Sequence, residues 1–154
     1  MKRTNQRLRL CAALLLINLV FIWGNSLLPG SVSGAISGWV RDMLASFFPG
    51  EPSDPESGHG LVRKLAHFTE FACLGGLLVW LLSMLRKPVA LALLCGFIAA
   101  GVDETIQLFV PDRGPSVRDV LIDTFGVLAG MILLLAGYAV SKKRAKNFLE
   151  DAKP

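Results

Sequence analysis

Ionisable side chains occupy matching positions at the ends of long apolar stretches in this sequence. His67 and Glu70 fall near the start of one stretch, Asp103 and Glu104 near the end of the next, and Asp123 near the start of the last. If successive stretches cross a bilayer in opposite directions, all these groups lie at the same face. Histidine and carboxylates gathered in this way are suited to acid–base chemistry or to binding a polar ligand. We therefore expect a functional pocket at that face, because ionisable groups inside a membrane are costly and mark sites.

Helical spacing strengthens this expectation. Lys64, His67 and Glu70 are three residues apart and Asp119 and Asp123 are four apart, so each set lies along one face of a helix. A carboxylate as deep as that of Glu70 needs a partner, and the arginines at positions 113 and 118 are the expected donors.

The elements that position these groups are four apolar stretches of the length that a spanning helix needs, about 20 residues. The chain is 53% hydrophobic, with a mean hydropathy of +0.53, which is too apolar for an ordinary soluble domain. We predict an all-α integral membrane protein, a four-transmembrane-helix bundle. The predicted spans are Leu10–Leu28, Leu65–Leu85, Val89–Val110 and Val120–Val140.

The basic residues predict the orientation of the bundle, because Lys and Arg are enriched on the cytoplasmic side. One side carries the chain start, Arg86, Lys87 and the basic run Lys142–Lys146, whereas basic residues on the other side are accompanied by acids. Both termini are therefore predicted to be cytoplasmic, with a membrane domain over residues 10–140 between basic tails at 1–9 and 141–154. The net charge of +4 then reflects topology, and we expect the lipid bilayer, not nucleic acid, as partner.

The first outside loop is long enough to have structure of its own. Its apolar residues recur at helical spacing and predict an amphipathic helix, which either lies in the outer membrane interface or packs over the mouth of the bundle. These apolar residues are Ile36, Trp39, Val40, Met43, Leu44, Phe47 and Phe48. The segment Gly50–Gly58 that follows is rich in turn-forming residues and has no helical period.

The second outside loop is short and must end the third helix, because it contains Pro111, Gly114 and Pro115. Ser116 followed by Asp119 resembles a capping box at the start of the fourth helix, with the shorter acid. In that helix, Gly126 and Gly130 are four residues apart, and we interpret this spacing as helix packing.

Several segments together resemble the VanZ-like membrane protein family. They are RKLAHFTEF at 63–71, DETIQLFVPDR at 103–113, RDVLIDTFG at 118–126 and SLLPGSVSGAISGW at 26–39. The resemblance extends roughly from Leu10 to Val140. It implies a four-helix bacterial cell-membrane domain of a family whose namesake is associated with reduced susceptibility to the glycopeptide teicoplanin.

The family motif maps onto eight residues, which we take as candidate ligand-binding residues. They are Lys64, His67, Glu70, Glu104, Gln107, Arg113, Asp119 and Asp123. Two positions depart from the pattern. Many relatives carry histidine where this chain has Ile106, which weakens any two-histidine metal site, and many carry glycine where it has Asp112.

Some of these residues also have simpler structural interpretations. Glu104 and Arg113 can form an ion pair that ties the third helix to its loop, and Asp119 can be only a capping acid. Gln107 can hold a neighbouring acid. Asp123 lies more than a turn inside its helix and requires a specific partner.

Two functions use such a pocket. In the first, the protein engages an envelope lipid, a wall precursor or the glycopeptide itself, and so lowers susceptibility to drugs such as teicoplanin. In the alternative, it is an intramembrane enzyme that acts on a lipid-linked envelope substrate, with candidate acid–base residues His67, Glu70 and Glu104. A proton-coupled transporter is disfavoured, because no polar residues line the inner half.

We expect no cofactor and assign no metal ligand. A divalent cation held by His67, Glu104, Asp119 and Asp123 would lack a recognisable ligand spacing. No nucleophile motif and no phosphate-binding glycine loop is present either, which favours binding over catalysis.

Overall fold

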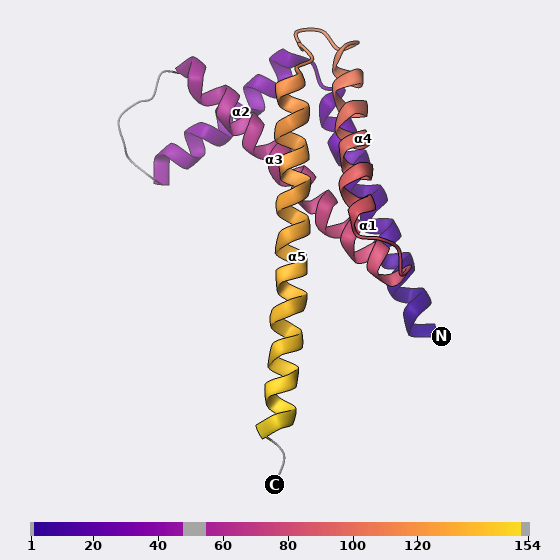
Figure 1. Cartoon of the computed structure of the whole chain (residues 1–154). Helices are drawn as coiled ribbons and strands as arrows, with labels where there is room; N and C mark the ends of the chain where they lie inside the picture. The colour runs from indigo at the N-terminus through magenta and orange to yellow at the C-terminus, as the bar shows by residue number, and fades with distance from the viewer. Residues whose placement is uncertain (1, 48–54, 152–154) are drawn as a thin grey trace.

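The computed structural model describes residues 2–47 and 55–151, and the side chains of 4–43 and 61–148. The described residues contain helices and no strands, as predicted (Figure 1). The helices are α1 Lys2–Ser26, α2 Gly30–Phe47, α3 Pro55–Met84, α4 Ala90–Gln107 and α5 Val117–Asp151.

Four of these helices are long and apolar enough to cross a membrane, which confirms the four predicted stretches. The candidate spans are Thr4–Ser26, Leu61–Met84, Ala90–Gln107 and Val117–Phe148. Many large apolar side chains on them, such as Leu16, Ile17 and Leu133, face outward and are exposed. Outward apolar side chains are expected of helices that contact lipid.

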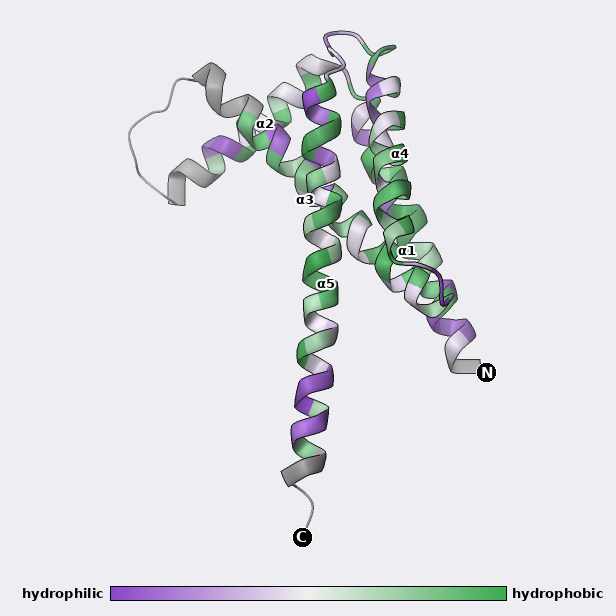
Figure 2. Cartoon of the chain, viewed as in Figure 1, coloured by the Kyte–Doolittle hydropathy of each residue, from purple (hydrophilic) through white to green (hydrophobic). Residues whose placement is uncertain are grey.

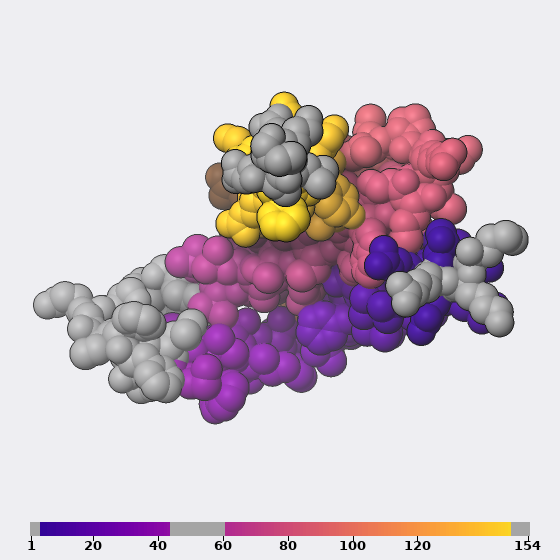
Figure 3. Space-filling view, turned by 90° about the horizontal axis from the view of Figure 1, so that it is seen from below, coloured from indigo at the N-terminus to yellow at the C-terminus, as the bar shows by residue number. Residues whose placement is uncertain are grey.

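Helix α3 is the centre of the bundle and contacts each of the other helices. Figure 3 shows it between α5 on one side and the α1–α2 layer on the other. Its closest neighbour is α5, and glycines permit the approach: a Cβ on Gly75 would overlap the carbonyl of Val127, and one on Gly130 would overlap the carbonyl of Ala72. The packing role predicted for Gly126 and Gly130 is thus confirmed.

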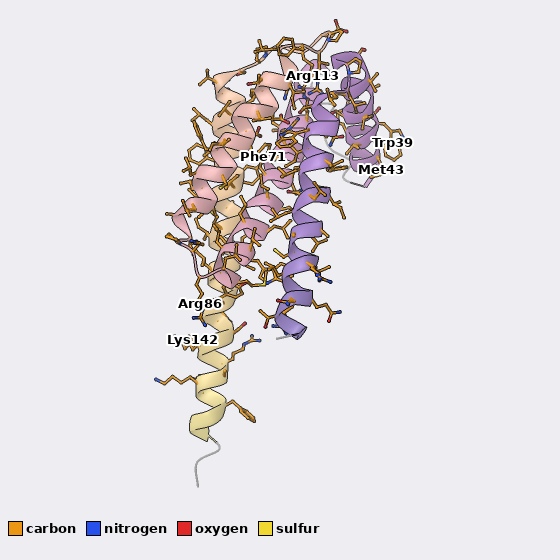
Figure 4. All side chains as sticks on the ribbon, turned by 90° about the vertical axis from the view of Figure 1, so that its right-hand side faces the viewer. Trp39, Met43, Phe71, Arg86, Arg113 and Lys142 are labelled. Atoms are coloured by element: carbon orange, nitrogen blue, oxygen red, sulfur yellow. The ribbon has the colours of Figure 1, made fainter. Side chains whose placement is uncertain are left out.

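The apolar core lies along the contact between α3 and α5. It lies below the end of the bundle that carries the loop between α4 and α5, which we call the polar end. Phe71 on α3 is fully buried, at mid-height between Arg113 at one end and Arg86 with Lys142 toward the other (Figure 4). The buried core residues around it are Cys11, Leu15, Ile22, Leu74, Val79, Ala92, Ala99, Ala100, Val127 and Met131.

Helix α2 follows the turn after α1 and packs on α3. It is fixed at its start, where the Gly30 N–H donates to the carbonyl of Pro111 at 3.0 Å. Ser37 is buried, whereas Trp39, 67% exposed, points away from the bundle (Figure 4). The helix expected in this loop is therefore present. Of the apolar residues named for it, the side chains of Leu44, Phe47 and Phe48 lie outside the described residues.

The segment expected to lack helix, Gly50–Gly58, is helical in its second half. Residues 50–54 lie outside the described part, but α3 begins at Pro55. Proline is favoured in the first turn of a helix, where its missing N–H has no partner to lose. The interpretation of this segment as turn-rich and without a helical period was therefore wrong for residues 55–58.

The two termini lie at the same end of the bundle, opposite the loop between α4 and α5 (Figure 1). Hydrophilic residues gather at that end on α1 and α5, and again around the polar end of the bundle, with an apolar band between them (Figure 2). Within the described residues, α1 begins at Lys2 and α5 continues to Asp151, so both basic segments are helical.

Candidate functional site

A cavity of about 140 Å³ lies near the loop end of the bundle, between α3, α4 and α5. Its lining residues are Arg63, Lys64, His67, Glu104, Gln107, Gly114, Asp119, Ile122 and Asp123. Six of the eight residues expected to bind ligand thus lie around one cavity. The other two, Glu70 and Arg113, line a neighbouring cavity of about 90 Å³ that shares Arg63 and His67 with the first.

Helices α3 and α5 bring their polar residues to the site by the spacing seen in the sequence. Arg63 and His67 are four residues apart on α3, and Asp119 and Asp123 are four apart on α5. Because one helical turn is about 3.6 residues, each pair projects toward the same neighbour. The convergence of charges at one face is therefore a real juxtaposition in the fold.

Asp103 is the most firmly held acid of the site. Its side chain is fully buried; its Oδ1 accepts a hydrogen bond from Ser26 Oγ at 2.7 Å, and its Oδ2 accepts one from Gln107 Nε2 at 2.9 Å. The expected role of Gln107, to hold a neighbouring acid, matches this geometry. Through Ser26, α1 also takes part in orienting the site.

Glu104 serves as a cap for the next helix. Its Oε2 accepts from the backbone N–H of Ser116 at 2.7 Å, while Ser116 Oγ accepts from the N–H of Arg118 at 3.2 Å. In a capping box the acid three residues into the helix makes the first of these bonds. Here an acid from α4 makes it instead, and the expected capping acid, Asp119, lines the cavity.

Arg113 donates hydrogen bonds to backbone carbonyls at the carboxyl-terminal end of α1. Its Nε donates to the carbonyl of Leu28 at 3.0 Å and its Nη2 to the carbonyl of Asn25 at 2.9 Å. Partial burial of the guanidinium, which disfavours its charge, lowers the pKa of Arg113 from its usual value. A cation at the carbonyl end of a helix is favourable. Arg113 is thus bonded to carbonyls of the α1 end, not to Glu104.

The partner of Glu70 also differs from the expected arginines. Its Oε1 accepts from Asn25 Nδ2 at 2.9 Å. Asn25 lies in the first apolar stretch, which was judged only by its lack of charge. Its amide, and the neighbouring hydroxyl of Ser26, are the signals that a search for charged residues missed.

Arg63 is a further site residue absent from the expected set. Its Nη2 donates to Gln107 Oε1 at 3.0 Å, and it lines both polar cavities. The sequence pattern pointed to its neighbour Lys64, which is more exposed. The four-residue spacing between Arg63 and His67 was the available signal.

Several buried polar atoms around the two cavities have no hydrogen-bond partner within the described protein. They are His67 Nδ1, Glu70 Oε2, Arg113 Nη1 and Asp123 Oδ1. Buried polar groups are nearly always satisfied in native proteins, so such a cluster calls for an external partner.

Among the candidate acid–base residues, His67 is the one with a free ring nitrogen at the cavity. Glu104 is committed to Ser116 and also approached by Gln107 Nε2 at 3.3 Å, and Glu70 lines only the smaller polar cavity. Proton transfer at this site would therefore centre on His67.

Comparison with known proteins adds a family. The model of a family described as VanZ/LLP1 matches residues 6–138, which is most of the chain and includes every residue of the two polar cavities. No curated protein and no solved structure matches the chain.

Proposed function

Because this chain belongs to the VanZ/LLP1 family and is a multi-pass membrane protein, we propose that it lowers susceptibility to glycopeptides such as teicoplanin. It does so at a bacterial cell membrane, where its polar pocket faces outward and engages an envelope lipid or a lipid-linked wall precursor. The observation that carries this proposal is the pocket itself, which combines cations and acids at the end of the bundle away from the termini.

The lining of the pocket suits a ligand group that carries both a positive and a negative charge, or one that both donates and accepts hydrogen bonds. Arg63 and Lys64 supply cations, and Asp119 and Asp123 supply carboxylates. Guanidinium groups bind phosphate and carboxylate oxygens strongly, and carboxylates bind ammonium groups. Both kinds of group occur in phospholipid headgroups and in peptide parts of wall precursors.

The size of the pocket favours a headgroup over an intact drug. A cavity of about 140 Å³ lies below the range of about 300–1,000 Å³ that is typical of sites for drug-sized ligands. A glycopeptide is larger still. The protein therefore acts on what the drug meets at the membrane, and does not enclose the drug.

An apolar groove beside the polar cavities supports an amphiphilic ligand. The groove measures about 630 Å³ and lies between α1, α2 and α3. It shares Ala66 and Glu70 with the smaller polar cavity, which in turn shares Arg63 and His67 with the larger one. A headgroup at Arg63 and an acyl chain along Phe21 and Leu65 would use this continuous path.

The alternative, an intramembrane enzyme acting on a lipid-linked substrate, is favoured by one observation. His67 lines the cavity with an unpartnered Nδ1, so its imidazole is available to take or give a proton. This function uses the same ligand and the same pocket.

The test measures teicoplanin susceptibility of a sensitive Gram-positive host that expresses the protein. The variant is the double change Arg63→Gln with Lys64→Gln, and the matched control is Arg118→Gln, an exposed arginine outside the cavity lining. We expect the intact protein and Arg118→Gln to raise the minimal inhibitory concentration, and the double variant to lose this effect at equal membrane levels.

The same proteins, purified in mild detergent, are analysed for co-purifying lipid by mass spectrometry. The intact protein should retain a lipid that the double variant loses. No protection by well-expressed intact protein would contradict the resistance role, and equal protection by the double variant would contradict the pocket as its site.

A further inference from the structure

Three side chains from three helices meet beside the larger polar cavity, and two of them, His67 and Asp123, line it. His67 comes from α3, Asp103 from α4 and Asp123 from α5, and one potential ligand atom from each lies within 4.8 Å of the other two. Asp103 and Asp123 are 0% and 2% exposed, and the His67 side chain is 13% exposed. Imidazole nitrogen and carboxylate oxygens are ligand atoms for divalent metal ions.

In the described part of the chain, the two buried carboxylates form no close ion pair with a lysine or an arginine. Within the described residues, no lysine or arginine nitrogen lies within 4.0 Å of Asp103 or Asp123. The nearby arginines donate to other groups, Arg63 to Gln107 and Arg113 to backbone carbonyls. Buried charges are paired or coordinate metals, so a bound cation would supply the counter-charge of these groups.

The unpartnered atoms point to the place of that counter-charge. Asp123 is almost completely buried, yet its Oδ1 has no hydrogen-bond partner, and neither has His67 Nδ1. His67 Nδ1 lies 3.9 Å from Asp103 Oδ2, which is too far for a hydrogen bond. Two ligands bound to one ion at about 2.1 Å each lie roughly 3–4 Å apart, so this separation suits an ion between them.

Asp103 is held by hydrogen bonds of the kind that commonly orient the ligands of a metal ion. Ser26 Oγ and Gln107 Nε2 donate to its two oxygens at 2.7 and 2.9 Å, and they come from α1 and α4. Such outer hydrogen bonds fix the direction of a ligand carboxylate and are a regular feature of metal sites.

We propose that His67, Asp103 and Asp123 form a binding site for a divalent first-row transition-metal cation, Zn²⁺ or Mn²⁺. One imidazole and two carboxylates suit these ions, and the two carboxylates balance the charge of one divalent ion. Three protein ligands leave a position for a further ligand. His67 and Asp123 also line the larger cavity, so that position is reached from the pocket.

This ligand set replaces the one considered from the sequence. Glu104 is occupied by the Ser116 N–H, and Asp119 is outside the group of three. Asp103 is the carboxylate ligand from α4 instead, because it is buried within the bundle, where Ser26 Oγ donates to it. Metal binding by these three residues does not require the lipid ligand proposed above.

The test measures metal binding by the purified full-length protein in detergent. After treatment with a chelator, the protein is equilibrated with Zn²⁺ or with Mn²⁺, and bound metal is determined by mass spectrometry and calorimetry. The variants Asp123→Asn and His67→Gln remove ligands, and Asp119→Asn removes a carboxylate of the same cavity that is not in the group. Circular dichroism and gel filtration check that each variant is folded.

We expect about one ion per chain for the intact protein and for Asp119→Asn, and binding at least about tenfold weaker for the two ligand variants. Failure of the intact protein to bind either ion, or equal binding by Asp123→Asn and His67→Gln, would overturn the site. Drug susceptibility is measured separately, so loss of the metal site and failure of the proposed function are distinguishable.

Discussion

At the scale of single residues, the loop before α5 contains a backbone conformation that is unusual for the residue type that adopts it. Asp112 has φ 58°, in the left-handed region that favours glycine. The Arg113 N–H donates to the carbonyl of Val110 at 3.3 Å, so Val110–Arg113 is a turn with proline second and a positive φ third, the pattern of a type II turn. Glycine, which the VanZ-like resemblance leads us to expect at this position, would adopt this conformation without strain.

A first prediction concerns this position. Asp112→Gly should leave stability unchanged or raise it by about 1 kcal/mol, whereas Asp112→Val should cost about 1–3 kcal/mol, because a β-branched residue is strained at positive φ. Asp112→Asn is the control, since asparagine tolerates this conformation without the charge. Thermal unfolding in detergent measures the effect, and a stable Asp112→Val protein would contradict it.

The convergence of the polar residues was predictable from the sequence, but their partners were not. Spacing placed His67, Glu70 and Asp123 at one face, and the structure brings them around adjoining cavities. Asn25 and Ser26 were missed because the first apolar stretch was judged only by its lack of charged residues. Which hydroxyl meets which carboxylate depends on how the helices cross, and hydropathy carries no information on that.

At the scale of elements, apolar length was sufficient to find the four spans, and it was less informative at their ends. The third predicted span, Val89–Val110, ends three residues too late, because α4 stops at Gln107. The second predicted span begins at Leu65, whereas α3 begins ten residues earlier. Hydropathy reports where lipid contact is possible, whereas a helix ends where its backbone loses partners. The polar first turns of α3 are helical and lie outside the apolar window.

A second prediction tests the glycine contact between α3 and α5. Gly130→Ala should destabilise the protein by about 1–3 kcal/mol, because its Cβ would overlap the carbonyl of Ala72 on α3. Gly137→Ala, on the same helix with nothing within 4 Å, should be neutral or stabilising by up to about 1 kcal/mol. The midpoint of thermal unfolding distinguishes them, and equal effects would refute the contact.

At the scale of the whole molecule, charge and fold together imply an orientation. The termini and the loop with Arg86 lie toward one end, and the loop with Gly114 lies at the other (Figures 1 and 4). Basic residues clearly outnumber acidic ones at the first end, which is therefore expected inside the cell.

A third prediction follows from this orientation. In a variant without native cysteines, Gly114→Cys should react in intact cells with a maleimide that cannot cross the membrane, and Lys87→Cys should react only after permeabilisation. Gly114 has open space around it, so the new side chain is accommodated. The reverse labelling pattern would contradict cytoplasmic termini.

Helix α5 is longer than a membrane crossing requires. Its 35 residues span about 52 Å, well beyond the roughly 30 Å of a bilayer core. It packs on α3 at Gly126 and Gly130, so Asp123 lies on the pocket side of this contact and Lys142 on the side of the termini. The turns of α5 beyond the bilayer core therefore carry the basic run Lys142–Lys146 out of the membrane on the side of the termini.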